Sequence, residues 1–376
     1  MKWEYKTLDQ LGTVSRGKSK HRPRNDPKLF GGKYPFIQTA DVKNADYYIT
    51  KYSDTYNESG LAQSKLWDKG TLCITIAANI ADTGVLAFPA CFPDSIMGFA
   101  PFEGVANTRF IKYCFDRLQR DCKQISQGTA QDNLSWEKLS TIKFCIPEYK
   151  EQCRIADILS AYDDLIENNQ KQIKLLEEAA QRLYKEWFLD LRFPGHENTK
   201  IVDGVPEGWS RGLLKELISV NYGKDHKKAP DDGNIPVYGS GGLMRKCNKS
   251  LFSGEAVLIP RKGSLNNIMY VDETFWTVDT MFYATMKQPH TAVFVYFFVK
   301  AFDMYSMNIG AAVPSMTTKI LDAMDVVIPD KETLEKFDKL TKTYFNKIKT
   351  LQGQNERLKT ARNLLLPKLM SGEVEV

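Results

Sequence analysis

The sequence predicts an α+β fold in which two similar globular domains are separated by an antiparallel two-helix coiled coil, as a pseudo-two-fold internal repeat. Three observations predict it: two stretches of the chain resemble one another, each is followed by heptad-spaced apolar residues, and short β-prone runs bounded by glycine and proline fill the remainder. A chain of 376 residues is long enough for two packed domains.

The repeat is defined by two constant shifts. Near the start of each half, Trp3 and Gly17 align with Trp209 and Gly223, residues that lie 206 positions further on. At the end of each half the alignment holds at a shift of 182 positions, through Gly128 with Gly310, Leu134 with Met316, and the Ile146-Pro147 pair with Ile328-Pro329. The order is therefore a domain (1–146), a spacer helix (147–193), a linker and second domain (194–328), and a second spacer helix with a tail (329–376).

Each Ile-Pro pair is followed by apolar residues at alternating spacings of four and three, the pattern of a coiled-coil seam. The first seam is Ile155, Leu159, Tyr162, Ile166, Asn169, Ile173, Leu176, Ala180, Leu183 and Trp187. The second is Phe337, Thr341, Tyr344, Ile348, Leu351, Asn355, Leu358, Arg362, Leu365 and Leu369. One such stripe is more often a core-facing helix, but two matched stripes in a repeat favour mutual pairing, antiparallel if a two-fold relates the halves.

The domains themselves are expected to be mixed. Residues 71–76, 256–259 and 274–278 are rich in β-branched and aromatic side chains and predict strands. Residues 109–122 and 291–303 favour short helices. We expect an α+β domain with a twisted or partly closed sheet in each half.

Composition narrows the functional classes. The net charge of +5 makes a polyanionic partner plausible without requiring one. Seven cysteines with no C-x-x-C pair and only four histidines argue against a zinc site, and we expect no metal and no cofactor. The start is not a signal peptide and the longest apolar run, around residues 291–299, is too short for a membrane span, so we expect a cytoplasmic protein without a membrane partner.

The segment Gly12–Ser19 matches the phosphate-binding pattern G-x-x-x-x-G-K-[ST]. Such a loop works only when a helix follows it, because the first turn of that helix binds the phosphate. Pro23 and Pro27 forbid a continuous helix there, and the matching stretch 218–225 lacks the first glycine and the hydroxyl. A P-loop nucleotide hydrolase is therefore kept only as an alternative, testable by ATP binding that is lost on Lys18→Ala.

Clusters of cations follow the same predicted strand in both halves and could neutralise phosphates. In the first half they are Arg16, Lys18, Lys20, Arg22, Arg24, Lys28 and Lys33. In the second they are Lys224, His226, Lys227 and Lys228, then Arg245, Lys246 and Lys249, then Arg261 and Lys262. Polar residues able to read base edges lie among them: Gln38, Thr39 and Asn79, and Tyr238, Ser240, Ser264, Asn266 and Asn267. Ordinary solvated turns have similar compositions, so only the duplication favours DNA contact.

Taken together, the chain resembles the specificity subunit of Type I restriction-modification systems over essentially its whole length. The resemblance is carried by Val205-Pro-Glu-Gly-Trp209 at the start of the second half and by the Gly-x(17)-Ile-Pro closings that end at Pro147 and Pro329. The helices after them and the terminal segment 364–372 complete it. The chain departs from the pattern at Met1-Lys-Trp3, which lacks the Pro-Glu-Gly lead-in.

The resemblance implies a DNA-binding subunit without a catalytic centre. Each domain would read one part of a split site in double-stranded DNA, the helices would set the gap, and two methyltransferase subunits would dock alongside; a restriction-translocase subunit is left open. A rod of about 60 Å spans more than one DNA turn of about 34 Å. The other alternative is a coiled-coil scaffold that binds no DNA, which sequence-dependent, salt-sensitive DNA affinity would exclude.

Overall fold

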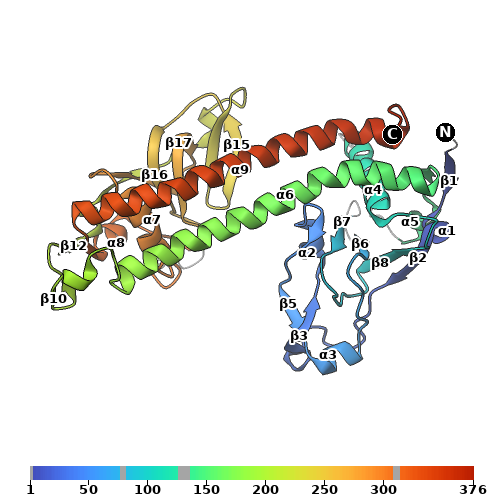
Figure 1. Ribbon diagram of the computed structural model, residues 1–376, viewed down its shortest axis with the longest axis horizontal. Helices are drawn as coiled ribbons and strands as arrows, with labels where there is room; N and C mark the ends of the chain where they lie inside the picture. Colours follow the sequence, from blue (N-terminus) through green and yellow to red (C-terminus); the bar gives the residue numbers. More distant parts are fainter. Residues whose placement is uncertain (1–2, 77–81, 126–135, 308–313) are drawn as a thin grey trace. The chain divides into compact units, whose positions relative to one another are not determined.

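The computed structural model describes residues 3–76, 82–125, 136–307 and 314–376 (Figure 1). Gly128, Leu134 and Gly310 of the predicted repeat, and the candidate base reader Asn79, lie outside these residues. The chain divides into two compact units: unit 1 comprises Met1–Lys171 with Leu351–Val376, and unit 2 comprises Gln172–Thr350. Two long helices, α6 (Tyr149–Tyr184) and α9 (Lys331–Ser371), each contribute one part to either unit.

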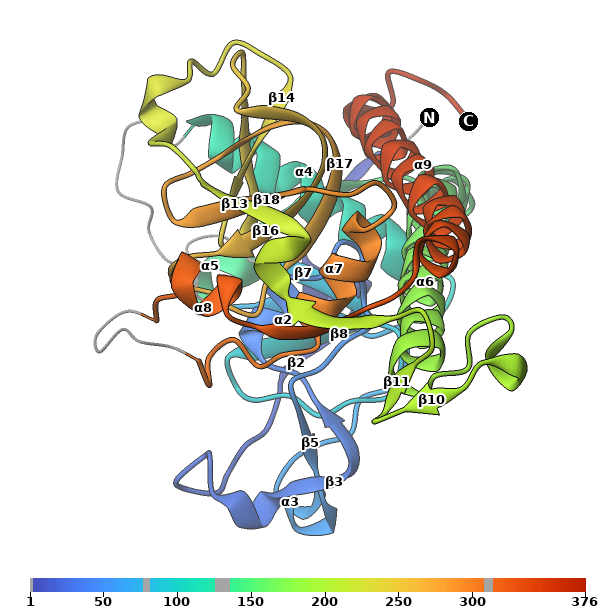
Figure 2. The same ribbon diagram turned by 90° about the vertical axis from the view of Figure 1, so that its left-hand side faces the viewer.

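Unit 1 is built around a five-stranded sheet of order β2-β8-β6-β7-β4, with α4 packed on it. Its elements are β1 Glu4–Lys6, α1 Leu8–Leu11, β2 Gly12–Arg16, η1 Pro27–Leu29, β3 Phe30–Phe36, α2 Thr39–Lys43, β4 Tyr48–Ile49, β5 Asp54–Tyr56, α3 Glu58–Ala62, β6 Leu72–Thr75, β7 Thr83–Leu86, β8 Ile96–Pro101, α4 Thr108–Ile125, α5 Trp136–Thr141 and β9 Phe144–Ile146. Figure 2 shows β3, β5 and α3 projecting from this sheet.

Unit 2 is built around a six-stranded sheet of order β13-β18-β16-β17-β14-β15. Its elements, after the π-helical turn η2 Lys185–Leu189 that ends α6, are η3 His196–Asn198, β10 Ile201–Val202, β11 Val205–Pro206, β12 Ser210–Leu213, η4 Leu214–Glu216, β13 Ile218–Tyr222, η5 His226–Lys228, β14 Ile235–Gly239, β15 Gly242–Cys247, β16 Phe252–Pro260, β17 Met269–Thr277, β18 Met281–Met286, α7 Ala292–Lys300, α8 Thr318–Asp322 and β19 Asp325–Ile328.

The two sheets share one topology. The order β2-β8-β6-β7-β4 corresponds strand for strand to β13-β18-β16-β17-β14, and in both sheets only the last of these pairings, β4 with β7 and β14 with β17, is parallel. A small antiparallel pair, β1 with β9 and β12 with β19, closes each domain. β13 lies 206 residues after β2, and α9 begins 182 residues after α6. The predicted α+β fold with an internal repeat is confirmed.

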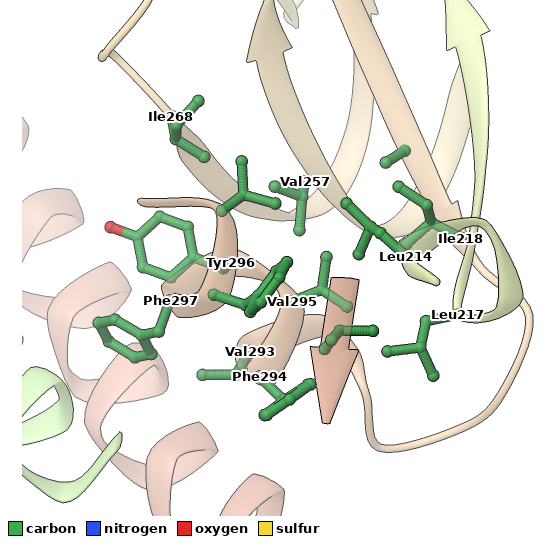
Figure 3. Close-up of a cluster of buried hydrophobic side chains, with 14 of the residues drawn as sticks. Leu214, Leu217, Ile218, Val257, Ile268, Val293, Phe294, Val295, Tyr296 and Phe297 are labelled. Carbon is green, nitrogen blue, oxygen red and sulfur yellow. The ribbon is translucent and has the colours of Figure 1, made fainter. Parts of the chain in front are cut away.

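Helix α7 shows how the core of unit 2 forms. Eight of its nine residues, from Ala292 to Val299, are buried, and a helix that is apolar all round must be covered on every side. Val293 and Val295 lie in one buried cluster with Val257 of β16 (Figure 3). Phe297 instead meets Tyr184 of α6, with ring centroids 5.5 Å apart. This helix therefore ties the sheet of unit 2 to the helix segments of the same unit.

The predicted heptad seams are confirmed, since every seam position of α6 and its continuation, and of α9, is buried or half-buried. Within unit 1, Asn169 of α6 donates to Asn355 of α9 at 2.9 Å, and Asp163 of α6 pairs with Arg362 of α9. The earlier residue of α6 thus meets the later residue of α9, as in an antiparallel pair. Within unit 2, the rings of Tyr184 and Trp187 contact Phe337. Figure 1 shows that the two helix segments run in opposite directions within each unit.

The local predictions can also be compared with the structure. The predicted strands are β6, β16 and β17, and the predicted short helices are α4 and α7. Gly12–Arg16, the first part of the phosphate-loop match, is strand β2, and no helix occurs between it and η1. The helix that a phosphate-binding loop requires directly after Ser19 is therefore absent from this described segment. No helix among the described residues is long and apolar enough to cross a membrane.

Candidate nucleic-acid interface

Three of the predicted segments in unit 2 come together around the turn at residues 278–280. The backbone N–H of Arg261 donates to Thr280 O at 2.8 Å, and that of Lys224 donates to Thr277 O at 2.9 Å. Val278 N donates to Tyr238 O at 3.0 Å. We call residues 222–228, 238–242, 261–267 and 277–280 the loop cluster of unit 2. Segments far apart in sequence thus form one local surface, as binding loops on a rigid scaffold do.

The basic residues of this loop cluster differ in how exposed their side chains are. Lys224, Lys227 and Lys262 are exposed, as is the hydroxyl-bearing Ser264. His226 is half-buried in η5, whose N-terminus is capped by the Asp225 carboxylate accepting from Lys227 N at 3.0 Å. Lys228 belongs to η5, and its side chain lies outside the described part of the chain. The exposed lysines are the groups best placed to meet phosphate oxygens.

Several predicted base readers are already bonded inside unit 2. Asn266 donates to Asp303 Oδ1 at 3.0 Å and accepts from Met304 N at 2.8 Å, while Asn267 donates to Ser240 O at 2.8 Å. These amides hold neighbouring loops together. Their role in base reading stays a prediction, because a bonded amide reads a base only by giving up or sharing these partners.

The side chains of Tyr238 and Arg245 are likewise bonded to other residues of unit 2. Burial, reinforced by a hydrogen bond from the Tyr238 hydroxyl to Glu273 at 2.5 Å, raises the pKa of Tyr238 well above its ordinary value. The Arg245 guanidinium donates to Ala229 O at 2.8 Å and pairs with Asp231. Arg245 thereby fastens the loop after η5 to strand β15. Of the remaining basic residues in this region, Lys246 and Lys249 are exposed.

In unit 1 the corresponding basic loop follows β2 in the same way. Gly17 N donates to Ile96 O at 2.9 Å, and the equivalent Gly223 N donates to Met281 O at 3.0 Å. A Cβ at Gly17 would lie 2.2 Å from Phe92 O, and one at Gly223 would lie 2.0 Å from Val278 O. Both positions therefore require glycine, because the backbone of the loop passes directly over a neighbouring turn.

The loop after β2 in unit 1 is held by hydrogen bonds to its backbone carbonyls, and most of its cationic side chains are exposed. Ser64 Oγ donates to Lys18 O at 2.7 Å, and the Arg22 guanidinium donates to Ser19 O at 2.6 Å. Among the residues that the structure describes, no carboxylate forms an ion pair with four exposed cations: Arg16, Lys18, Lys20 and Lys28. These are available for phosphate without breaking an existing pair.

Two other cations of unit 1 are paired with carboxylates, and two of its candidate base readers, Gln38 and Thr39, lie among the described residues. Arg24 pairs with Asp94 at 2.7 Å. Lys33 pairs with Glu58 at 3.1 Å, and the hydrogen bond between them raises the pKa of Lys33 and lowers that of Glu58. Such exposed pairs are weak and exchangeable. Gln38 donates to Asp54 at 2.6 Å, and Thr39 is the half-buried first residue of α2.

Sequence reasoning missed one exposed aromatic residue of unit 2, Tyr222, and the contact that Trp209 makes. Tyr222, at the end of β13, is exposed and lies beside Arg261. Trp209 donates its indole N–H to Asp330 at 2.9 Å, at the start of α9. Two features of the sequence could have pointed to them. Tyr222 aligns with the candidate phosphate-binding residue Arg16 at the shift of 206 residues, and Trp209 belongs to the Val-Pro-Glu-Gly-Trp motif.

The sequence profile described as "Type I restriction modification DNA specificity domain" matches residues 1–178 and 206–360. The chain belongs to this family. The two matched ranges fall on the two halves of the repeat. They include both sheets and the basic loops that follow β2 and β13. The chain is a DNA-binding, DNA-recognition subunit of a restriction-modification system.

Relatives and a solved structure agree with this assignment. The Type I restriction enzyme MjaIX specificity subunit of Methanocaldococcus jannaschii is 26% identical, over 100% of this chain and 94% of the relative. The HindI specificity subunit of Haemophilus influenzae is 23% identical, over 64% of this chain and 71% of the relative. The crystal structure of a Type I restriction-modification S subunit from M. genitalium covers 98% of this chain and 96% of its own with a TM-score of 0.60 at 18% identity, and so shares the fold.

Proposed function

We propose that this chain recognises a split site in double-stranded DNA, with one part read by each domain. The observation that carries the proposal is the repeated loop after β2 and β13, which follows the same sheet topology in both units and bears cations in both. A repeated scaffold with different loop side chains suits the reading of two different short sequences on a common plan. The first domain corresponds to residues 1–146 and the second to residues 194–328.

The chemistry in this proposal belongs to partner subunits. The sequence contains no Asn-Pro-Pro or Asp-Pro-Pro core of an adenine methyltransferase, since no two prolines are adjacent. Two methyltransferase subunits are proposed to dock on the helices, one for each half of the repeat, and a restriction-translocase subunit can join them. Exposed leucines outside the seams support a protein partner there: Leu165 and Leu175 of α6 and Leu364 of α9 are 52%, 64% and 67% exposed.

The test exchanges one reader at a time. Residues 1–146 are replaced by the corresponding domain of another member of the family, and the methylated sequences are mapped for the complex of the full chain with its methyltransferase partner. One part of the recognised site is expected to change and the other to stay, because each domain reads alone. The reciprocal exchange of residues 194–328 is the matched control and is expected to change the other part. A site in which both parts change after either exchange would overturn the proposal.

A further inference from the structure

One pair of side chains in unit 2 has the geometry of a base-reading group. Tyr222 is the last residue of β13, and 54% of it is exposed. Its ring rests on the buried ring of Phe282, with centroids 5.1 Å apart. The guanidinium carbon of Arg261 lies 5.4 Å from the centroid of the Tyr222 ring, within the range of a cation–π contact. The Tyr222 ring is therefore a braced platform for the Arg261 side chain.

Arg261 is also fixed through its backbone. It directly follows the end of β16 at Pro260. Its N–H donates to Thr280 O at 2.8 Å, and its carbonyl accepts from Met316 N at 2.9 Å. In the side chain, Nη1 donates to Asp279 O at 3.2 Å. A guanidinium restrained in this way loses less conformational freedom on binding than a free side chain does.

The Nε–Nη2 edge of the Arg261 guanidinium makes no hydrogen bond within the described residues. Within the described residues, Nε and Nη2 of Arg261 donate to no acceptor, and no carboxylate forms an ion pair with this side chain. The Nε–Nη2 edge presents two parallel N–H groups, which bind two adjacent acceptors at once. In the major groove guanine presents O6 and N7 as such a pair, and arginine to guanine is the commonest specific contact.

A phosphate also presents paired oxygens, so the surroundings decide between the two ligands. Lys224 and Lys262 are exposed members of the same loop cluster and carry point charges on flexible stems, which suit phosphates. Arg261 is half-buried, oriented by a ring and a carbonyl, and close in sequence to the uncharged Ser264. A directional group flanked by flexible cations matches the division in which phosphate contacts position a protein and base contacts specify the sequence.

We propose that Arg261 reads a guanine in the part of the DNA site bound by the second domain, with Tyr222 as a positioning residue. The inference rests on the proposed function, because it requires that domain to bind duplex DNA. It concerns unit 2 alone, since the equivalent connection of unit 1, between β6 and β7, includes residues outside those described.

The first experiment selects binding sites from randomised duplex DNA with the full chain in complex with its methyltransferase partner. Arg261→Lys keeps the charge but removes the fork, so it is expected to reduce the preference for guanine at one position roughly 5- to 150-fold and to leave every other position unchanged. Tyr222→Leu removes the platform and is expected to cause a smaller loss at the same position. Lys262→Ala is the matched control: it is expected to weaken binding to all sequences alike and to lower the salt slope by about 1.

The second experiment changes the DNA instead of the protein, so it does not depend on the folding of a variant. 7-Deazaguanine lacks the N7 acceptor and is placed in turn at each guanine of the part of the site read by the second domain. At one position it is expected to weaken binding by the wild-type complex by a factor of about ten, and to leave binding by an Arg261→Ala complex unchanged, because that variant has no side-chain donor for N7.

The outcomes separate this inference from the function on which it rests. A wild-type complex that selects a split site, with Arg261→Lys selecting the same bases, would overturn the assignment of Arg261 alone. A uniform loss of affinity in Arg261→Lys, like that expected for Lys262→Ala, would make Arg261 a phosphate contact and would also overturn it. Insensitivity of the wild-type complex to 7-deazaguanine at every guanine tested would do the same. A wild-type complex that selects no sequence would overturn the proposed function, and this inference with it.

Discussion

Asp330 shows how a single residue joins a motif to a helix. Its carboxylate accepts from Thr333 N at 3.0 Å and from Thr333 Oγ1 at 2.6 Å, which caps the start of α9. The indole of Trp209 donates to the same carboxylate, so the Val-Pro-Glu-Gly-Trp motif contacts the helix that closes the repeat. Partial burial acts to raise the pKa of Asp330, but the hydrogen bonds from Thr333 and Trp209 outweigh it and lower that pKa below 3.8.

Asp330→Ala is expected to lower the free energy of unfolding by about 0.5 to 2 kcal/mol at neutral pH, because the cap is lost. A carboxyl whose folded pKa is depressed stabilises the fold above its unfolded pKa, and this contribution disappears as the pH falls through the folded pKa. The difference between wild type and variant should therefore shrink below the ordinary value of 3.8. Urea unfolding followed by circular dichroism at several pH values measures it.

The control for this prediction is Glu335→Ala, since Glu335 is exposed on the same helix. It is expected to change the unfolding free energy by less than about 0.5 kcal/mol. A deficit for Asp330→Ala that stays constant from neutral pH to about pH 3 would contradict the role given to the ionised carboxylate.

At the scale of elements, the polar seam positions are explained by their partners. Asn169 and Asn355 face one another in the helix segments of unit 1, and both are buried. Asp163 of α6 accepts from Tyr113 of α4 at 2.5 Å and also pairs with Arg362 of α9, which joins three helices of the unit. Thr341 bonds to the Phe337 carbonyl of its own helix at 2.8 Å. A polar pair in an apolar seam disfavours other registers, in which each member would be buried without a partner.

Asn169→Leu alone is expected to destabilise unit 1 by about 1 to 3 kcal/mol, because the Asn355 amide stays buried without its partner. The double variant with Asn355→Leu should recover most of this loss, since replacing both members of a buried pair by apolar groups is nearly neutral. The coupling is measured by a double-mutant cycle of urea unfolding. Additive losses from the two substitutions would show that the amides do not act as a pair.

At the scale of the whole molecule, sequence order and compact units do not coincide. Unit 1 is completed by the C-terminal part of the chain: Leu366, Leu369 and Met370 share its core with Ile155 and Leu159. The linear division into four consecutive segments therefore describes the repeat, while the contacts assign each helix to both units. Both units consequently include a part of each of the two long helices.

If these helices set the gap of the split site, their length should control it. Inserting seven residues into α6 between Lys171 and Gln172, and seven into α9 between Thr350 and Leu351, adds about 10 Å of helix. The recognised gap is expected to lengthen by about three base pairs at roughly 3.4 Å each, with the two half-site sequences preserved. Methylation mapping of the complex measures this.

An insertion in α6 alone is the matched control for this experiment. It breaks the register of the seams and is expected to destabilise the protein instead of producing a new gap. A doubly extended protein that folds and methylates sites with the original gap would rule out the helices as the spacer.

Local periodicity and the repeat were determined by the sequence itself. The seams were readable because the side-chain period of a helix is a local property, and the shifts of 206 and 182 residues recur in β2 with β13 and in α6 with α9. The glycine at position 17 was visible as part of a motif, although its reason, the close approach of Phe92 O, was not.

Only the tertiary structure decided which polar side chains are free. Asn266 is bonded to residues 303 and 304, and Tyr238 to Glu273, so both are committed although their residue types suit base reading. Arg261 gained importance because Tyr222, far away in sequence, lies against it. Hydrogen-bond partners and ring contacts come from distant segments, and no local pattern in the chain encodes which segments will meet.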